Sequence, residues 1–241
     1  MRKSIVFIAA LMVASLISCK KEEMKSGGSD AQADPVSRRS DTTRIDSVVY
    51  FDADGKKMSP DRIDERLDYC LLLEPLSGRI GKATYFTSTD AFYAFIKKDE
   101  AKYREVIAKM DFVRSIQDRA AEMGIDWESD KTPPESLTEY IESWRDGSYR
   151  TAKVTGAGLL YEHYVHPNPG GSTTPFFTFP RWTLGGFRNK ASSAVVVGLN
   201  FLWDKTWFRG KTAVIFGFPY GVIPFVKPYG IDYNDRAEST F

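Results

Sequence analysis

The chain contains 241 residues and has a formal net charge of +1, because 33 basic side chains are balanced by 32 acidic ones. This balance excludes nucleic acid as a partner, since nucleic-acid binding needs a concentrated basic surface. Hydrophobic residues make up 42% of the chain, which is enough for one large or two small cores. The chain has two cysteines, Cys19 and Cys70.

Residues 1–18 have the pattern of a secretory signal peptide. Two basic residues precede an apolar run of about thirteen residues, Ile5–Ile17, which is too short to cross a bilayer core of about 30 Å. The run ends in Leu16-Ile17-Ser18-Cys19, which resembles the lipobox of bacterial lipoproteins. The resemblance implies cleavage before Cys19, acylation of that residue and attachment to a membrane through the lipid. An ordinary signal or a short membrane anchor is the alternative.

Residues 19–43 predict a disordered tether, because they are rich in Ser, Gly, Asp and Arg and lack apolar periodicity. Lys20 follows the cysteine, in place of the Asp that retains many enteric lipoproteins in the inner membrane. We therefore expect an outer-membrane lipoprotein, on either the periplasmic or the cell-surface face. The Lys20–Glu23 run resembles the short charged signals of surface-exposed lipoproteins, and a solvated linker is the alternative.

Residues 44–147 predict an α+β domain of unknown role. The β-rich stretches Ser47–Phe51 and Ala83–Thr87 predict strands. Asp52–Gly55 predicts a turn, since it lacks the further acidic ligands of a calcium-binding EF-hand loop. Cys70 lies in an apolar run and is interpreted as a small buried hydrophobic residue.

The same segment predicts four helices. The longest carries apolar residues at three- and four-residue steps from Tyr103 to Met123 and ends at Gly124. A second is expected over Asp61–Asp68, after the cap Ser59 and Pro60. A third is capped by Ser88 or Thr89 and carries Phe92, Phe95 and Ile96 on one face. The fourth is a short helix that carries Leu137, Tyr140, Ile141 and Trp144. Gly147 marks the expected boundary with a second domain.

Residues 151–241 contain two related sequences about 46 residues apart, which suggests a duplicated β unit. The first signature is Arg188-Asn189-Lys190-Ala191-Ser192-Ser193, and the second is Asn234-Asp235-Arg236-Ala237-Glu238-Ser239. Trp203 and Gly210, seven positions apart, fit a folded hairpin whose bend needs a glycine with positive φ. A longer hairpin of the same kind is expected from Tyr161–His163 to Gly170–Ser172.

These residues resemble the βγ-crystallin domain, whose two Greek-key motifs each end in (Asn/Asp)-(Asn/Asp)-X-X-(Ser/Thr)-Ser. Two positions depart from the pattern: Arg188 replaces the first Asn or Asp, and Glu238 replaces the fifth-position Ser or Thr. The expected fold is therefore an α+β N-terminal domain followed by an all-β Greek-key sandwich. In such a domain Ser193 and Ser239 are structural, because their hydroxyls bond to the backbone of the folded hairpins.

The resemblance also implies calcium as a ligand, held by oxygen atoms from both signatures. The first site would use the Lys190 carbonyl, the Ser192 hydroxyl, the Asp235 carboxylate and a carbonyl near Glu162 or His163. The second site would use the Arg236 carbonyl, the side chains of Glu238 and Asn189, and a carbonyl near Asp204 or Lys205. A sandwich of this family that has lost calcium affinity is the alternative.

Other chemistries have weaker signals. Glu162, His163 and His166 could hold a transition metal, but no HExxH helix or cysteine partner accompanies them, which favours a solvated loop. No Gly-x-Ser-x-Gly elbow is present, so an enzyme is not expected. The expected function is a lipid-anchored, non-enzymatic envelope protein that binds calcium for stability. The alternative is a calcium-independent recognition or inhibitor-like module whose aromatic loop Thr174–Trp182 contacts a protein partner.

Overall fold

The computed structural model describes residues 45–125, 134–151, 156–165, 168–177, 180–225, 230–231 and 233–241. The predicted signal peptide, Cys19, the tether and His166 lie outside these residues. Ser40–Phe241 forms one compact unit. No helix in the described part of the chain is both long and apolar enough to cross a membrane.

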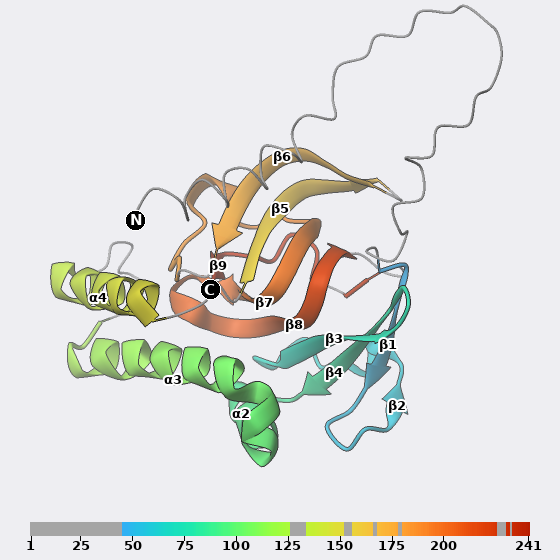
Figure 1. Cartoon of the computed structure of the whole chain (residues 1–241), viewed down its shortest axis with the longest axis horizontal. Coiled ribbons are helices and arrows are strands. Elements are labelled where there is room, and N and C mark those ends of the chain that lie inside the picture. Colours follow the sequence, from blue (N-terminus) through green and yellow to red (C-terminus); the bar gives the residue numbers. More distant parts are fainter. Residues whose placement is uncertain are drawn as a thin grey trace, which may run out of the picture. The chain divides into compact units, whose positions relative to one another are not determined.

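The strands form one mixed sheet in the order β2-β1-β4-β3-β8-β7-β5-β6, with β9 paired to β7 (Figure 1). The pairs β1–β4 and β3–β8 are parallel, and the others are antiparallel. The strand bounds are β1 Ser47–Phe51, β2 Lys57–Met58, β3 Cys70–Ser77, β4 Ile80–Phe86, β5 Gly156–Val165, β6 Asn168–Phe177, β7 Ser193–Lys205, β8 Arg209–Pro224 and β9 Ser239–Thr240.

The pairing of β3 with β8 joins the N-terminal and C-terminal halves of the described chain. It runs in register from Cys70 opposite Thr212 to Leu73 opposite Ile215. Strands from residues 44–147 and from residues 151–241 therefore share one sheet. Separate folding of these two segments stays a prediction.

Strands β7 and β8 are long and bent. The ladder between them shifts register near Gly198 and again between Trp203 and Lys205, as at β-bulges. The first part of β7 pairs with β5, whereas Leu202 and Trp203 pair with β9. Bulged strands can turn a sheet over its own core, so the arrangement agrees with a folded sheet. A crystallin-like Greek key is a finer statement and stays a prediction.

The helices follow the chain after β4: α2 Thr89–Ile96, α3 Glu100–Glu122 and α4 Glu135–Thr151. Helix α2 begins where the Ser88 hydroxyl accepts a hydrogen bond from the Ala91 N–H, as its sequence predicted. Helix α3 is followed by Gly124, whose φ of 66° is typical of a residue that ends a helix. The stripe predicted to be core on α3 is buried from Tyr103 to Ala120, whereas its last member, Met123, is exposed.

The predicted lengths of two helices were wrong. The helix expected over Asp61–Asp68 is only the 3-10 turn Pro60–Arg62. The Asp64 carboxylate accepts the Arg66 N–H, which favours a turn over a continued helix. The helix expected around Leu137 is longer than predicted, because α4 continues through Gly147. Gly147 therefore does not mark the end of an element.

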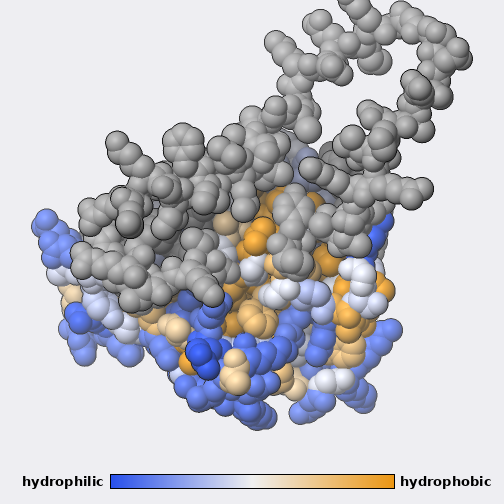
Figure 2. All heavy atoms as spheres, viewed as in Figure 1, coloured by the Kyte–Doolittle hydropathy of each residue, from blue (hydrophilic) through white to orange (hydrophobic). Residues whose placement is uncertain are grey.

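The two faces of the sheet carry separate cores. On β3, alternate side chains divide between them: Leu71 and Leu73 belong to one cluster, and Cys70 and Leu72 to the other. The second cluster includes the apolar faces of α2, α3 and α4, which cover that side of the sheet (Figure 1). Apolar patches also reach the visible surface among hydrophilic side chains (Figure 2). The exposed large apolar residues of the described chain are Leu67, Leu76, Ile80, Met123 and Val197.

Candidate metal centre

The two signatures lie against each other and exchange equivalent backbone hydrogen bonds. The Asn189 N–H donates to the Ala237 carbonyl at 3.0 Å, and the Asp235 N–H donates to the Ala191 carbonyl at 2.8 Å. Asn189 and Asp235 both have φ of 54°, a left-handed conformation that Asn and Asp tolerate better than most residues. The backbone therefore places position two of each signature beside position four of the other.

The side chains follow the same reciprocal arrangement. The Ser192 hydroxyl lies 3.4 Å from Asp235 Oδ1, and Asn189 Nδ2 donates to Glu238 Oε1 at 2.8 Å. These are the two pairs expected to contribute side chains to the first and second calcium sites. The structure thus brings together residues more than forty positions apart in the sequence.

The sixth-position serines bond to the backbone of the hairpins. Ser239 Oγ donates to the Lys205 carbonyl at 2.8 Å and accepts the Phe208 N–H at 3.2 Å. Ser193 Oγ donates to the His163 carbonyl at 3.3 Å. Both side chains are fully buried. Each hydroxyl therefore links the end of one signature, through a hydrogen bond, to the hairpin that precedes it.

The hairpin from Trp203 to Gly210 depends on an unusual backbone. Trp207, Phe208 and Gly210 have φ values of 64°, 58° and 75°. A Cβ at Gly210 would lie 2.1 Å from Asp204 Oδ1, so the bend requires a glycine. Asp204 Oδ1 accepts the Lys211 N–H at 2.7 Å, although burial raises the pKa of this carboxyl.

At the first site, both oxygen atoms of the Asp235 carboxylate have partners, and the Ser192 hydroxyl donates to Oδ1. Asn234 Nδ2 donates to Asp235 Oδ2 at 2.7 Å. The Asn234 Oδ1 atom is buried and has no hydrogen-bond partner within the described residues. The Asp235 carboxylate and the Ser192 hydroxyl supply oxygen atoms of the kind that a hard cation such as Ca²⁺ prefers as ligands. These residues therefore fit the ion that the resemblance implies.

At the second site, Glu238 is already engaged. Its Oε1 accepts from Asn189, and its Oε2 lies 3.9 Å from Arg188 Nη1. The side chain of Glu238 is only 19% exposed, so the carboxylate is held between these two groups. The oxygen atoms expected to bind calcium here thus have partners within the chain.

The side chain of Arg236 is directed to the N-terminal half. Its Nη1 donates to Glu65 Oε2 at 2.7 Å and to the Tyr69 hydroxyl at 2.9 Å. Burial alone would raise the pKa of Glu65, but hydrogen bonds from Arg236 and Lys211 lower it below its ordinary value. Arg236 and Lys211 therefore share the negative charge of Glu65, which the sequence did not predict.

Glu162 and His163 are occupied by local contacts. The Glu162 carboxylate accepts the Ser172 N–H at 3.3 Å, and hydrogen bonds from the side chain and then the backbone of Ser172 lower the pKa of Glu162. The His163 carbonyl, a candidate ligand, accepts the bond from Ser193. The described residues contain no group of three or more His, Cys, Asp or Glu side chains that could hold a metal. A site here must therefore use hydroxyl, amide and carbonyl oxygens as well.

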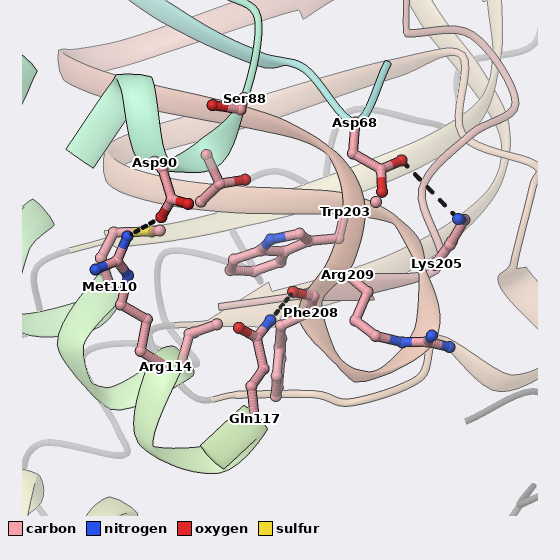
Figure 3. A pocket seen from close by; sticks show the side chains of 13 residues that line it. Asp68, Ser88, Asp90, Met110, Arg114, Gln117, Trp203, Lys205, Phe208 and Arg209 are labelled. Atoms are coloured by element: carbon pink, nitrogen blue, oxygen red, sulfur yellow. Dashed lines mark hydrogen bonds and ion pairs between the residues drawn. The ribbon is translucent and has the colours of Figure 1, made fainter. Parts of the chain in front are cut away.

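Sequence reasoning missed a hollow of about 440 Å³ between α3 and the β7–β8 hairpin. Trp203 lies across it, and ion pairs Asp90–Arg114 and Asp68–Lys205 stand at two sides (Figure 3). Gln117 Nε2 donates to the Phe208 carbonyl at 2.9 Å on a third side. The lining residues come from distant parts of the sequence, so no local pattern could have indicated the hollow.

The aromatic loop Thr174–Trp182, proposed as a contact for a protein partner, is partly packed inward. The Trp182 ring stacks on Trp207 with centroids 5.0 Å apart. Arg181 pairs with Thr240 through the backbone, and its Nη1 donates to the Pro175 carbonyl at 2.8 Å. These contacts do not favour the recognition-module alternative, although the side chains of residues 176–179 lie outside the description.

Comparison with known proteins assigns no family. No family model matches the chain, and neither a curated protein nor a solved structure matches it. The likeness to βγ-crystallin domains and the likeness to the lipobox therefore remain hypotheses based on the residues that suggested them.

Proposed function

We propose that this chain is a lipid-anchored, non-enzymatic protein of the bacterial cell envelope whose first signature site binds one Ca²⁺ ion. The ion would stabilise a Greek-key domain of the βγ-crystallin type. The observation that carries the proposal is the reciprocal placement of Ser192 beside Asp235 and Asn189 beside Glu238. Two sequences with the same pattern need not lie together, and the contact of these two at the positions that the resemblance assigns to calcium supports the proposal.

The chemistry of the first site supports calcium over a transition metal. Its side-chain donors are the Asp235 carboxylate and the Ser192 hydroxyl. Hard oxygen donors suit Ca²⁺, whereas Zn²⁺ and Cu²⁺ prefer imidazole or thiolate ligands. The carbonyls of Lys190 and the Glu162–His163 hairpin would complete the ligand set when the ion is bound.

The lipid anchor is supported by the sequence around Cys19. An acylated cysteine followed by a polar tether would hold the folded unit close to a membrane. We favour the outer membrane, because Lys20 stands where an inner-membrane retention signal would have Asp.

The calcium proposal is tested with a soluble chain that begins at Arg44. Calorimetric titration should detect Ca²⁺ binding, and thermal melts should shift upward between excess EDTA and millimolar Ca²⁺. A ligand that binds only the folded state stabilises it by about 2.7 kcal/mol at about one hundred times its Kd. Asp235→Ala removes the carboxylate of the first site and should abolish most of this shift.

Asp54→Ala is the matched control, because it removes an exposed carboxylate from a turn outside the signatures. Each variant is compared with itself in the two buffers, so any general loss of stability cancels. If the unmodified chain releases no heat on titration and melts at one temperature in both buffers, the calcium proposal is wrong.

A further inference from the structure

The two departures from the signature pattern lie at the same place. Arg188 holds position one of the first signature, and Glu238 holds position five of the second. Their side chains form an ion pair, with Arg188 Nη1 3.9 Å from Glu238 Oε2. The other oxygen of Glu238 accepts the hydrogen bond from Asn189. A cation and an acid thus replace two residues that would otherwise be neutral or acidic.

The equivalent position at the first site is different. Asn234 stands where the other signature has Arg188, and its amide contacts the Asp235 carboxylate. The side chains around Asp235 therefore supply oxygen atoms and one negative charge. At the second site, the charge of Arg188 cancels that of Glu238. The two sites share a backbone arrangement but differ in electrostatics.

We propose that the guanidinium of Arg188 serves as the built-in cation of the second site, so that the chain binds a single calcium ion at its first site. The inference rests on the proposed function for its statement about the first site. The new claim concerns the second site: the Arg188–Glu238 ion pair connects the two signatures in the absence of metal and prevents Ca²⁺ from binding there.

The physical reason is competition for one carboxylate. Ca²⁺ at the second site would need Glu238 as its only acidic side chain, and it would have to approach a guanidinium of the same sign. The Glu238 side chain is 19% exposed and that of Arg188 is 50% exposed, so solvent screens this repulsion only in part. Removal of the guanidinium should therefore open the site.

The test is the stoichiometry of Ca²⁺ binding, measured by calorimetry and by equilibrium dialysis with ⁴⁵Ca²⁺. The unmodified chain should bind one ion, and Arg188→Asn, which restores the residue type of the pattern, should bind two. Arg79→Asn is the matched control, since it breaks an arginine–carboxylate pair with Asp46 outside the signatures. It should leave the number of ions at one.

The two proposals fail in different ways. If the unmodified chain binds one ion and Arg188→Asn also binds one, the inference is overturned while the proposed function stands. If the unmodified chain binds none and Arg188→Asn binds one, the first site fails and the role of Arg188 holds. Two ions on the unmodified chain would overturn the inference directly. In an Asp235→Ala background, Arg188→Asn should still gain one ion, which assigns the new ion to the second site.

A second readout needs no metal. In excess EDTA, Arg188→Asn and Glu238→Gln should each lower the midpoint of urea unfolding, and the double variant should lose less than the two single losses combined. This non-additivity is expected for residues that interact directly. Strictly additive losses would show that Arg188 and Glu238 are not coupled, and the inference would fail.

Discussion

The equivalent serines of the two signatures are not equally bonded. Ser239 Oγ both donates to the Lys205 carbonyl and accepts the Phe208 N–H, whereas Ser193 Oγ makes one bond within the described residues, to the His163 carbonyl. Ser239→Ala should therefore remove two hydrogen bonds, one of them to the buried Phe208 N–H, and lower the free energy of unfolding by about 2–3 kcal/mol. Ser193→Ala should lower it by about 1 kcal/mol. Urea unfolding in EDTA measures both, and equal losses would contradict the assignment.

A second residue-scale prediction concerns Lys109, a buried lysine on α3. Its Nζ has no hydrogen-bond partner within the described residues and lies 4.4 Å from the centroid of the Phe241 ring. Burial lowers the pKa of Lys109 from 10.5 to about 7, although the nearby charge of Glu105 opposes the shift. Between these two pH values the unfolded chain holds a proton that the folded chain has lost. Stability from this group therefore increases as the pH rises from about 7 toward 10.5.

Lys109→Met should thus raise the free energy of unfolding by about 2–4 kcal/mol near neutral pH, since it removes a buried charge. The advantage over the unmodified chain should shrink as the pH approaches 10. Lys102→Met on the same helix is the control, because Lys102 Nζ lies 2.7 Å from Glu74 Oε1 and its replacement should not stabilise the fold. Urea unfolding at several pH values makes the measurement. A constant difference between Lys109→Met and the unmodified chain would contradict the titration.

Some of these contacts and buried side chains could be predicted from the sequence, and others could not. The signature pattern was enough to pair Ser192 with Asp235 and Asn189 with Glu238 as hypotheses. Lys109 could have been noticed, because it lies three residues after Val106 and four before Val113, within the apolar stripe of α3. The ion pairing of Arg236 with Glu65 could not, since it joins residues that no local pattern relates.

At the scale of elements, the strands and helices were easier to predict than their order. β-rich stretches located β1 and β4, and apolar residues at three- and four-residue steps located α2 and α3. The order of strands depends on pairings between distant residues, and two extended segments can pair with many partners. One signal was available: Cys70–Leu73 is a continuous apolar run, as is typical of strands buried on both faces. Such a run indicates an internal strand, which is what β3 is.

The pairing of β3 with β8 leads to a prediction about fragments. The sequence predicts that residues 151–241 fold alone, yet in the structure Phe201, Trp203 and Val214 pack in the same core as the helices. Separation would expose these side chains, each contributing about 1.5–3 kcal/mol when buried, and would free one edge of β8. We therefore expect fragment 151–241 to lack a cooperative thermal melt, whereas the chain from Arg44 shows a single transition. A sharp melt of the isolated fragment would support two independent domains.

For the whole molecule, the main functional consequence is that the candidate metal centre is coupled to the N-terminal half. Arg236 lies in the second signature, and its side chain is held by Glu65 and Tyr69. Strand β8 follows the Trp203–Gly210 hairpin and pairs with β3. If the proposed first site binds calcium, the stabilisation should therefore extend across the sheet, and not only over residues 151–241.

The location of the molecule is a separate question, and it depends on Cys19. If Leu16–Cys19 functions as a lipobox, the mature protein carries acyl chains on Cys19 and partitions into membranes, because each buried CH₂ contributes about 0.8 kcal/mol. Cys19→Ser should abolish incorporation of labelled palmitate and shift the protein from the detergent phase to the aqueous phase. Cys70→Ala is the matched control, since Cys70 is fully buried and burial raises the pKa of its thiol well above the ordinary value. It should keep the label at the unmodified level, and unchanged labelling of Cys19→Ser would rule out the anchor.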